Sequence, residues 1–438
     1  MPGDPPRGVP RREFVRSSVA IGGAAALAAC IESETETESE ETTTDERQFP
    51  QGPADPSVLP ERQHAWNEFL VTDPNGDTVL PRHQVLLLLE YTGSVPPSDG
   101  ERSTVEGALR TVERAFERGT GGDAGATFNR GLLFTLGYAP GYFDRFDASL
   151  PTGLDLPSPD AVVDELDEDA AADDADALLV LVGDYGSVLL GAEAALTGET
   201  ETVNGVDVEA TLADVFDVVD RRTGVVGRGL PAEKLDRDAI ADDAPLSMGY
   251  KSGYADTNPA EDRVTIEEGP FAGGTTQLAS RLTIDLDRWY ELNDERRAKQ
   301  MFSTDHDAER VGSTGEALGS HSGIEEASTE DLEEKAAEHG CLGHGQKTAR
   351  ARDEEFRPRI LRRSESVATD PGSGVGMNFT SVQRGMEPFL DVRRAMNDDG
   401  GDIEAHRSGI VDFLEAERRA TFLVPPRSHR ALPTPRPE

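Results

Sequence analysis

A short stretch rich in metal-ligating side chains lies at residues 339–344, where the sequence is HGCLGH. His339, Cys341 and His344 offer two imidazoles and a thiol, which are ligands that zinc and copper accept. A fourth ligand is not obvious, and spacing by glycines alone is weak support for a metal site. Two interpretations are therefore open: a dedicated zinc or copper site, and a loop with a small buried Cys341 and histidines that hold no such ion.

The elements before this stretch follow an αβ pattern. Continuous apolar runs at residues 83–91, 131–137 and 177–183 have the length of buried strands. A capping-box pattern at 103–106 predicts the start of an amphipathic helix, and 187–196 can form a second helix. The order strand, helix, strand, strand, helix is typical of a ferredoxin-like α+β unit.

A second half with a similar order begins near residue 246. Its predicted elements are a strand at 273–284, a helix at 287–301, short strands at 359–362 and 377–382, and a helix at 386–396. We therefore expect an α+β fold of two ferredoxin-like domains, at 61–243 and 244–426. No residue-level repeat links the halves, so only the order of elements suggests a duplication.

Several motifs of the second half, taken in order, resemble the dye-decolourising peroxidase family. They are MGYKSGY at 248–254, GPFAGG at 269–274, LDRW at 286–289, GH at 343–344, PRILRR at 358–363, SVQR at 381–384 and FLVPP at 422–426. The similarity covers roughly residues 75–426 and is weak in the first half. It implies two ferredoxin-like domains of the dimeric α+β barrel superfamily, haem b as cofactor, and hydrogen peroxide plus an unknown reductant as substrates.

The resemblance also assigns roles to two residues. It makes His344 the proximal axial ligand of the haem iron and Arg362 the distal arginine. The chemistry agrees, because an imidazole can supply axial nitrogen to haem iron and a guanidinium can stabilise negative charge on a peroxide oxygen.

The sequence departs from the family at Ser252, where the family has an aspartate that moves a proton during peroxide cleavage. An unassisted hydroxyl is a poor base, so Ser252 can position a water but should not replace the carboxylate. Asp256 is a candidate substitute base four residues on. Ser364 occupies the distal position where a partner asparagine is sometimes found, two residues after the arginine. We therefore expect a haem pocket with weakened peroxidase activity.

The N-terminus predicts export and lipid attachment. Arg11 and Arg12 precede a short run of small and apolar residues that ends at Cys30, which resembles a twin-arginine signal with a lipobox at residues 1–30. This implies the Tat translocase as partner and a lipid anchor on the outer face of the cell membrane, although a retained, poor membrane helix is the alternative. Residues 31–60 predict an acidic disordered linker, and 427–438 a disordered tail.

Composition narrows the functional classes. The 438 residues contain 84 Asp and Glu against 43 Lys and Arg, which gives a net charge of −41 and argues against nonspecific binding of nucleic acid. So acidic a surface suggests a halophilic protein, because salt screens the self-repulsion. Only two cysteines are present, which excludes a disulfide framework. The oligomeric state is left open, a homo-oligomer included.

Two functions from different classes agree with these observations. The first is an exported haem protein that catalyses peroxide-dependent oxidation, as a peroxidase does, with activity weakened by the change at Ser252. The second is a noncatalytic surface lipoprotein of the same fold that handles haem or iron.

Overall fold

The computed structural model describes residues 49–120, 127–235, 240–369, 375–397 and 409–437. The export motif, with Arg11, Arg12 and Cys30, lies outside the described residues. Within the described ranges, no helix combines the length and the apolar character needed to cross a membrane.

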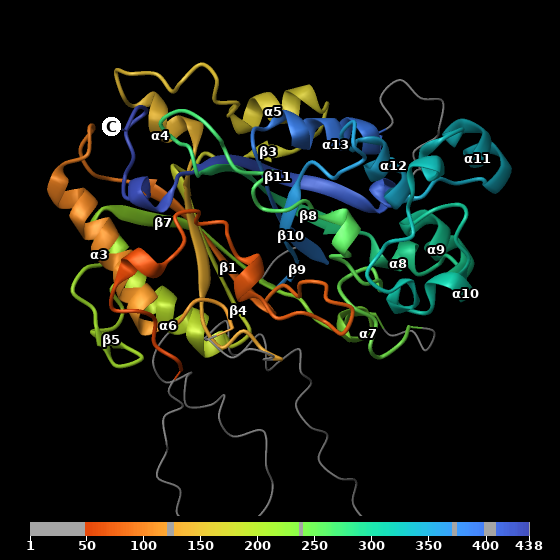
Figure 1. Cartoon of the computed structure of the whole chain (residues 1–438), viewed down its shortest axis with the longest axis horizontal. Helices are drawn as coiled ribbons and strands as arrows, with labels where there is room; N and C mark the ends of the chain where they lie inside the picture. The colour runs from red at the N-terminus through yellow and green to blue at the C-terminus, as the bar shows by residue number, and fades with distance from the viewer. Residues whose placement is uncertain (1–48, 121–126, 236–239, 370–374, 398–408, 438) are drawn as a thin grey trace, which may run out of the picture.

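The described strands form one large sheet that closes into a barrel (Figure 1). Its order is β2-β4-β1-β7-β9-β10-β8-β11-β3, and β11 pairs again with β2 through Leu423 and Tyr138. The strands are β1 His83–Tyr91, β2 Leu133–Tyr138, β3 Ala171–Ala172, β4 Ala177–Gly183, β7 Phe216–Val225, β8 Thr275–Ile284, β9 Leu361–Ala368, β10 Gly376–Gln383 and β11 Leu414–Val424, with a separate hairpin of β5 Thr202–Val203 and β6 Val206–Asp207.

Both halves have the strand order of a ferredoxin-like unit. The first half runs β2-β4-β1-β7 and the second β9-β10-β8-β11, so each half places its first and third strands in the centre. All the pairings between these strands are antiparallel. The predicted α+β fold of two ferredoxin-like units is confirmed.

The helices cover the outside of the barrel. The first half has α3 Asp99–Ala115, α4 Pro140–Asp144, α5 Pro159–Glu165, α6 Gly186–Leu196 and α7 Leu230–Lys234. The second has α8 Leu286–Trp289, α9 Asp294–Met301, α10 Ala308–Val311, α11 Leu332–His339, α12 His344–Arg350 and α13 Glu387–Asn397. Figure 1 shows α3 and α6 on one side of the sheet and α8 to α12 gathered at the opposite end.

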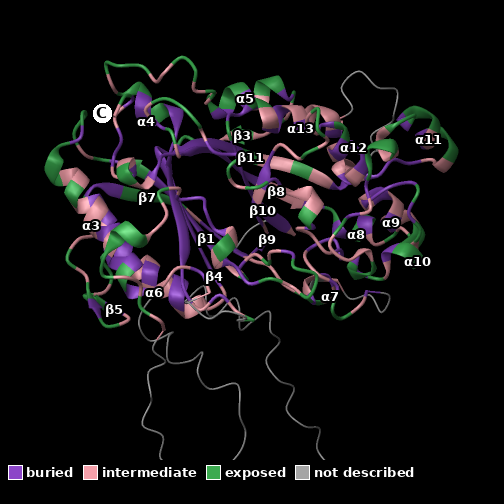
Figure 2. Cartoon of the chain, in the orientation of Figure 1, coloured by how far each residue is buried: buried purple, intermediate pink, exposed green. Residues whose placement is uncertain are grey.

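Strand β1 is apolar from Val85 to Leu89 because both of its faces are buried there. Leu87 and its neighbours of the same parity pack with residues of α3 and α6, whereas Leu86 and Leu88 pack with Phe422 of β11 inside the barrel. Figure 2 shows this burial as a continuous purple core along the sheet. A strand buried on both faces gives an apolar run without alternation, which is why β1 and β4 have the predicted bounds.

Polar contacts inside the barrel join the two halves. Gln84 of β1 accepts hydrogen bonds at Oε1 from Ser364 and Ser366 of β9, at 2.6 Å each. Asn378 of β10 donates from Nδ2 to the carbonyl oxygen of Thr223 in β7 at 3.0 Å. These buried bonds and the short β7–β9 pairing fix β9 against the first half.

Three local predictions are wrong or incomplete. Helix α3 begins after Ser98, whose side chain and that of Glu101 form the capping box, and not at the pattern at 103–106. The single helix predicted at 287–301 is two helices, α8 and α9, because Asn293 caps a new start. Strand β7 was missed because residues 217–220 are exposed and two of the four are aspartates.

Both terminal segments are more ordered than composition suggested. The ring centroids of Phe49 and Tyr185 lie 5.3 Å apart, so part of the predicted disordered linker packs on the folded body. At the other end Arg430 is buried and donates from Nε to Glu106 at 2.9 Å and from Nη1 to Glu113 at 2.5 Å. The predicted disordered tail is therefore wrong for residues 427–437, because Arg427 and Arg430 both bind the buried carboxylate of Glu113.

Replacing Arg430 tests this docking of the chain end. Arg430→Ala leaves the Glu113 carboxylate buried with only part of its partners, so the free energy of unfolding should fall by about 3–5 kcal/mol in urea titration. The control is Arg436→Ala, an exposed arginine of the same segment with one hydrogen bond to a backbone carbonyl. Equal stability of the two variants would mean that the segment is not docked.

Candidate functional site

A β-bulge in β9 decides which side chains face the candidate site. Between β9 and β10 the register shifts, so that Thr380 pairs with Ser364 and the next residue, Ser381, pairs with Arg362. Arg363 is the extra residue, and a bulge of this kind re-aims the side chains beside it. As a result Arg363 and Ser364 both make contacts with the first half, at Trp66 and Gln84 respectively.

Arg362 and Glu365 then lie together on the other side of β9. Arg362 donates from Nη1 to Glu365 Oε1 at 3.1 Å and from Nη2 to Thr257 Oγ1 at 2.9 Å. Its backbone N–H donates to Asn258 Oδ1 at 3.3 Å. About a fifth of each of the two charged side chains is exposed. The guanidinium is therefore held in one orientation, on a rigid strand.

Ser252 belongs to the same cluster. Its hydroxyl donates to Glu365 Oε2, the carboxylate oxygen that does not bind Arg362. Burial alone would raise the pKa of Glu365, but the Arg362 charge and the Ser252 hydrogen bond outweigh it and hold the pKa below its usual range. The serine that replaces the expected aspartate thus contacts another carboxylate, which the sequence analysis did not identify.

His344 begins α12 in close contact with the chain around it. A Cβ on Gly343 would lie 2.2 Å from the carbonyl oxygen of Phe302, and one on Gly409 would lie 3.0 Å from the His344 backbone. Both positions therefore require glycine for this approach. The described residues offer no hydrogen-bond partner to the buried Nδ1 of His344.

The imidazole of His344 is neutral over the physiological pH range. Burial, and to a smaller degree the positive charge of Arg362, lower its pKa to about 4, while Glu365 acts in the opposite direction. Arg362 and Glu365 are thus near enough to act on His344 electrostatically. A neutral imidazole keeps a lone pair free for a metal.

A partly buried ion pair fixes the loop that carries Ser252. The Lys251 ammonium lies 2.8 Å from Asp73 Oδ2 and 2.6 Å from Asp77 Oδ2, and donates to the carbonyl oxygen of Gly319 at 3.1 Å. Asp77 also accepts from the backbone N–H of Ala255 at 3.1 Å. The loop is therefore attached to the first half on both sides of Ser252.

Two predicted site residues lie elsewhere. Ser364 faces Gln84 in the barrel, because the bulge turns it away from Arg362. Asp256 accepts hydrogen bonds from the backbone N–H and the hydroxyl of Ser322, at 2.9 and 2.8 Å, and lies 3.8 Å from Arg352. Its carboxylate is thus committed to structural partners.

The alternative zinc or copper site finds no support in the described part of the chain. No group of three or more His, Cys, Asp or Glu side chains there is arranged to hold a metal ion. Cys341 is fully buried, and burial raises the pKa of its thiol, which disfavours the thiolate that a metal would need.

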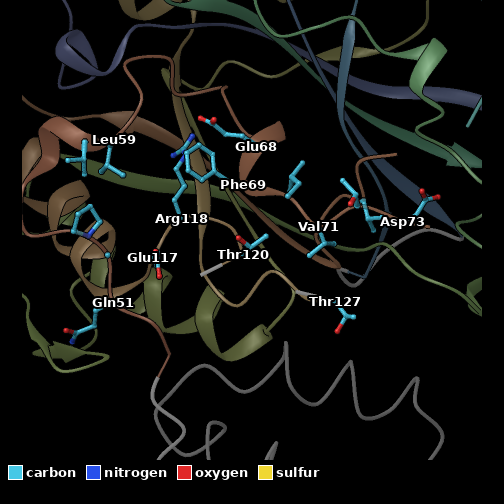
Figure 3. A pocket seen from close by; sticks show the side chains of 16 residues that line it. Gln51, Leu59, Glu68, Phe69, Val71, Asp73, Glu117, Arg118, Thr120 and Thr127 are labelled. Atoms are coloured by element: carbon cyan, nitrogen blue, oxygen red, sulfur yellow. The ribbon is translucent and has the colours of Figure 1, made fainter. Parts of the chain in front are cut away.

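A cavity of about 970 Å³ lies in the first half, apart from this cluster. Figure 3 shows the Arg118 side chain beside the ring of Phe69 at its wall, with Glu117 and Thr120 nearby. None of the residues singled out in the sequence contributes to its lining.

Residues 81–426 match a family of unknown function, DUF7405. The match covers more than half of the chain. The chain belongs to DUF7405. A comparison with curated protein sequences finds no match.

Solved structures of dye-decolourising peroxidases resemble the chain over most of its length. The encapsulated peroxidase of this type from Mycobacterium smegmatis is 16% identical, with a TM-score of 0.53 over 82% of this chain and 97% of that one. The dye-decolourising protein from Vibrio cholerae is 15% identical, with a TM-score of 0.51 over 82% and 96%. A DypB variant of Rhodococcus jostii in complex with haem is 16% identical, with a TM-score of 0.51 over 85% and 99%.

Identities this low show the fold and no more. The resemblance drawn from the sequence is therefore confirmed at the level of the fold: this member of DUF7405 has the two-unit ferredoxin-like architecture of dye-decolourising peroxidases.

The environment of His344 predicts a pH dependence of stability. Between its folded pKa of about 4 and its ordinary value near 6.5 the unfolded chain binds more protons, so stability rises with pH across that window. Acidification from pH 7 to 4 should therefore cost up to about 3 kcal/mol through this group. The free energy of unfolding of His344→Gln, measured in urea across this pH range, should lack this decrease. The exposed control His321→Gln should show the same decrease as the wild type.

Proposed function

We propose that this protein binds haem b through His344 and uses it to oxidise substrates with hydrogen peroxide. The observation that supports the proposal best is His344 itself, a neutral imidazole whose buried Nδ1 has no partner among the described residues. Such a group suits an axial ligand of iron. The fold shared with a peroxidase in complex with haem supports the choice of cofactor.

The residues of the cluster fit such a group. His344 begins helix α12. Arg362 and Glu365 lie on β9, and their charges affect the pKa of the His344 imidazole. When bound, haem would supply the two electrons that the reduction of peroxide requires. Arg362 would orient the peroxide and stabilise the negative charge that develops on its oxygen, and its hydrogen bonds to Glu365 and Thr257 hold the guanidinium ready.

Haem binding through His344 is tested by absorption spectroscopy. The protein purified after haem-supplemented expression should show a Soret band, and His344→Ala should lose most of it, because the iron loses its protein ligand. His321→Ala, at an exposed histidine, is the matched control and should keep the band. A full Soret band in His344→Ala would contradict the proposed ligand.

Peroxide turnover separates the two functional classes. A wild-type protein that binds haem and oxidises a phenol with hydrogen peroxide supports the enzyme. Haem binding without turnover would instead support the noncatalytic haem- or iron-handling lipoprotein, since that function needs only the iron ligand and the fold. Weakened activity, expected from the change at Ser252, depends on whether another group moves the proton.

We further propose that the protein is exported by the Tat translocase and anchored by a lipid on Cys30, in a salt-rich setting. The motif at Arg11, Arg12 and Cys30 and the acidic composition support this. Arg11→Lys combined with Arg12→Lys should block export, and Cys30→Ser should release the protein into the medium, as cell fractionation and immunoblotting would show. Unchanged membrane retention of Cys30→Ser would overturn the anchor.

A further inference from the structure

The carboxylate of Glu365 is the acidic group bonded to Arg362 in the cluster. One of its oxygens accepts from Arg362 at 3.1 Å and the other accepts from Ser252. It is also near enough to His344 for its charge to raise the pKa of that imidazole. A carboxylate fixed at both oxygens on a rigid strand has the orientation that a proton-transfer group needs.

Other nearby carboxylates are committed elsewhere. Asp256 binds Ser322 and lies beside Arg352, and Asp73 and Asp77 bind Lys251. Glu261 pairs with Arg363 on the opposite side of the β9 bulge. Among these acidic groups, only Glu365 contacts the arginine expected to bind peroxide.

We propose that Glu365 moves the proton during peroxide cleavage, as a catalytic residue supplied by β9 in place of the carboxylate missing at Ser252. This inference rests on the proposed haem-dependent function. The bulge at Arg363 makes it possible, because it turns Glu365 to the same side as Arg362. Ser252 is then a positioning residue that orients the second carboxylate oxygen of Glu365.

The proton transfer balances without any further group. Glu365 takes a proton from one oxygen of hydrogen peroxide and gives it to the other. The O–O bond then breaks with its electron pair on the protonated oxygen, which leaves as water. The bound haem would supply the two electrons for this cleavage, and two phenol molecules, each giving up one electron and one proton, would return those electrons and complete the second water. Arg362 stabilises the charge while the proton moves.

The first test removes the carboxylate and keeps its shape. Glu365→Gln in the haem-loaded protein should keep the Soret band and lose phenol turnover by roughly 10²- to 10⁴-fold. Glu354→Gln, at an exposed glutamate, is the matched control and should keep the wild-type rate.

A second readout follows the proton without turnover. Hydrogen cyanide must give up its proton to bind ferric iron as cyanide, so stopped-flow cyanide binding in Glu365→Gln should slow by about tenfold or more. If Glu365→Gln fails to hold haem, Glu365→Asp serves instead, because it keeps the negative charge but withdraws the carboxylate by one methylene. In Glu365→Asp, phenol turnover and the rate of cyanide binding should both decrease.

Moving the carboxylate between positions 252 and 365 tests directly whether Glu365 replaces the aspartate that is missing at Ser252. Ser252→Asp alone should give no gain, because a second carboxylate would face Glu365 at hydrogen-bond distance and the like charges would repel. The double variant Ser252→Asp with Glu365→Gln should recover at least about tenfold of the turnover that Glu365→Gln loses.

The outcomes of these experiments distinguish the role of Glu365 from the proposed haem-dependent function on which it rests. A wild-type protein that takes up no haem, or that takes it up without turnover, would overturn the proposed enzyme. A wild-type protein with turnover whose Glu365→Gln variant keeps both turnover and cyanide binding would overturn only the role of Glu365. A gain in turnover from Ser252→Asp alone would do the same, because it would show that the position lacks an acid.

Discussion

The single extra residue in β9 determines which side chains of this strand lie together. A regular strand would turn Arg362 and Ser364 to one side and Arg363 and Glu365 to the other. The bulge at Arg363 breaks this alternation, so Arg362 and Glu365 form one ion pair whose charges affect the pKa of His344, while Ser364 donates a hydrogen bond to Gln84 in the barrel. The same strand holds the two halves together, because it bonds to β10 along its length and to β7 at its end.

Sequence reasoning succeeded where burial leaves a simple pattern. The strands at His83–Tyr91 and Ala177–Gly183 were predicted at their observed bounds, because both faces of each are largely buried and each contains an unbroken apolar run. Strand β7 was missed for the opposite reason, since its residues 217–220 are exposed and include two aspartates. His344, Arg362 and Ser252 were predicted as one site, and charge effects and hydrogen bonds link them in the structure.

The positions of Ser364 and Glu365 depend on a bulge that leaves no mark in a single sequence, so Ser364 was expected at the site and Glu365 was not. Counting two residues from Arg362 led to Ser364, whereas the third residue, Glu365, is the one that accepts a hydrogen bond from Arg362. Asp256 was a reasonable candidate by spacing, yet Ser322 and Arg352 lie far from it in sequence and hold its carboxylate. Contacts between distant segments decided both cases, and periodicity carries no information about them.

The Lys251 ion pair places the first half under a constraint that its own sequence does not reveal. The ammonium is enclosed by two carboxylates of the loop that contains Asp73 and Asp77, and Ser252 follows it directly in the chain. Loss of either acid would leave the lysine partly buried with an incomplete partner, at the position next to the proposed pocket. Evolution of the first half is therefore limited by the second at these positions: among relatives, Asp73, Asp77 and Lys251 should change as a set, even where the rest of the first half diverges freely.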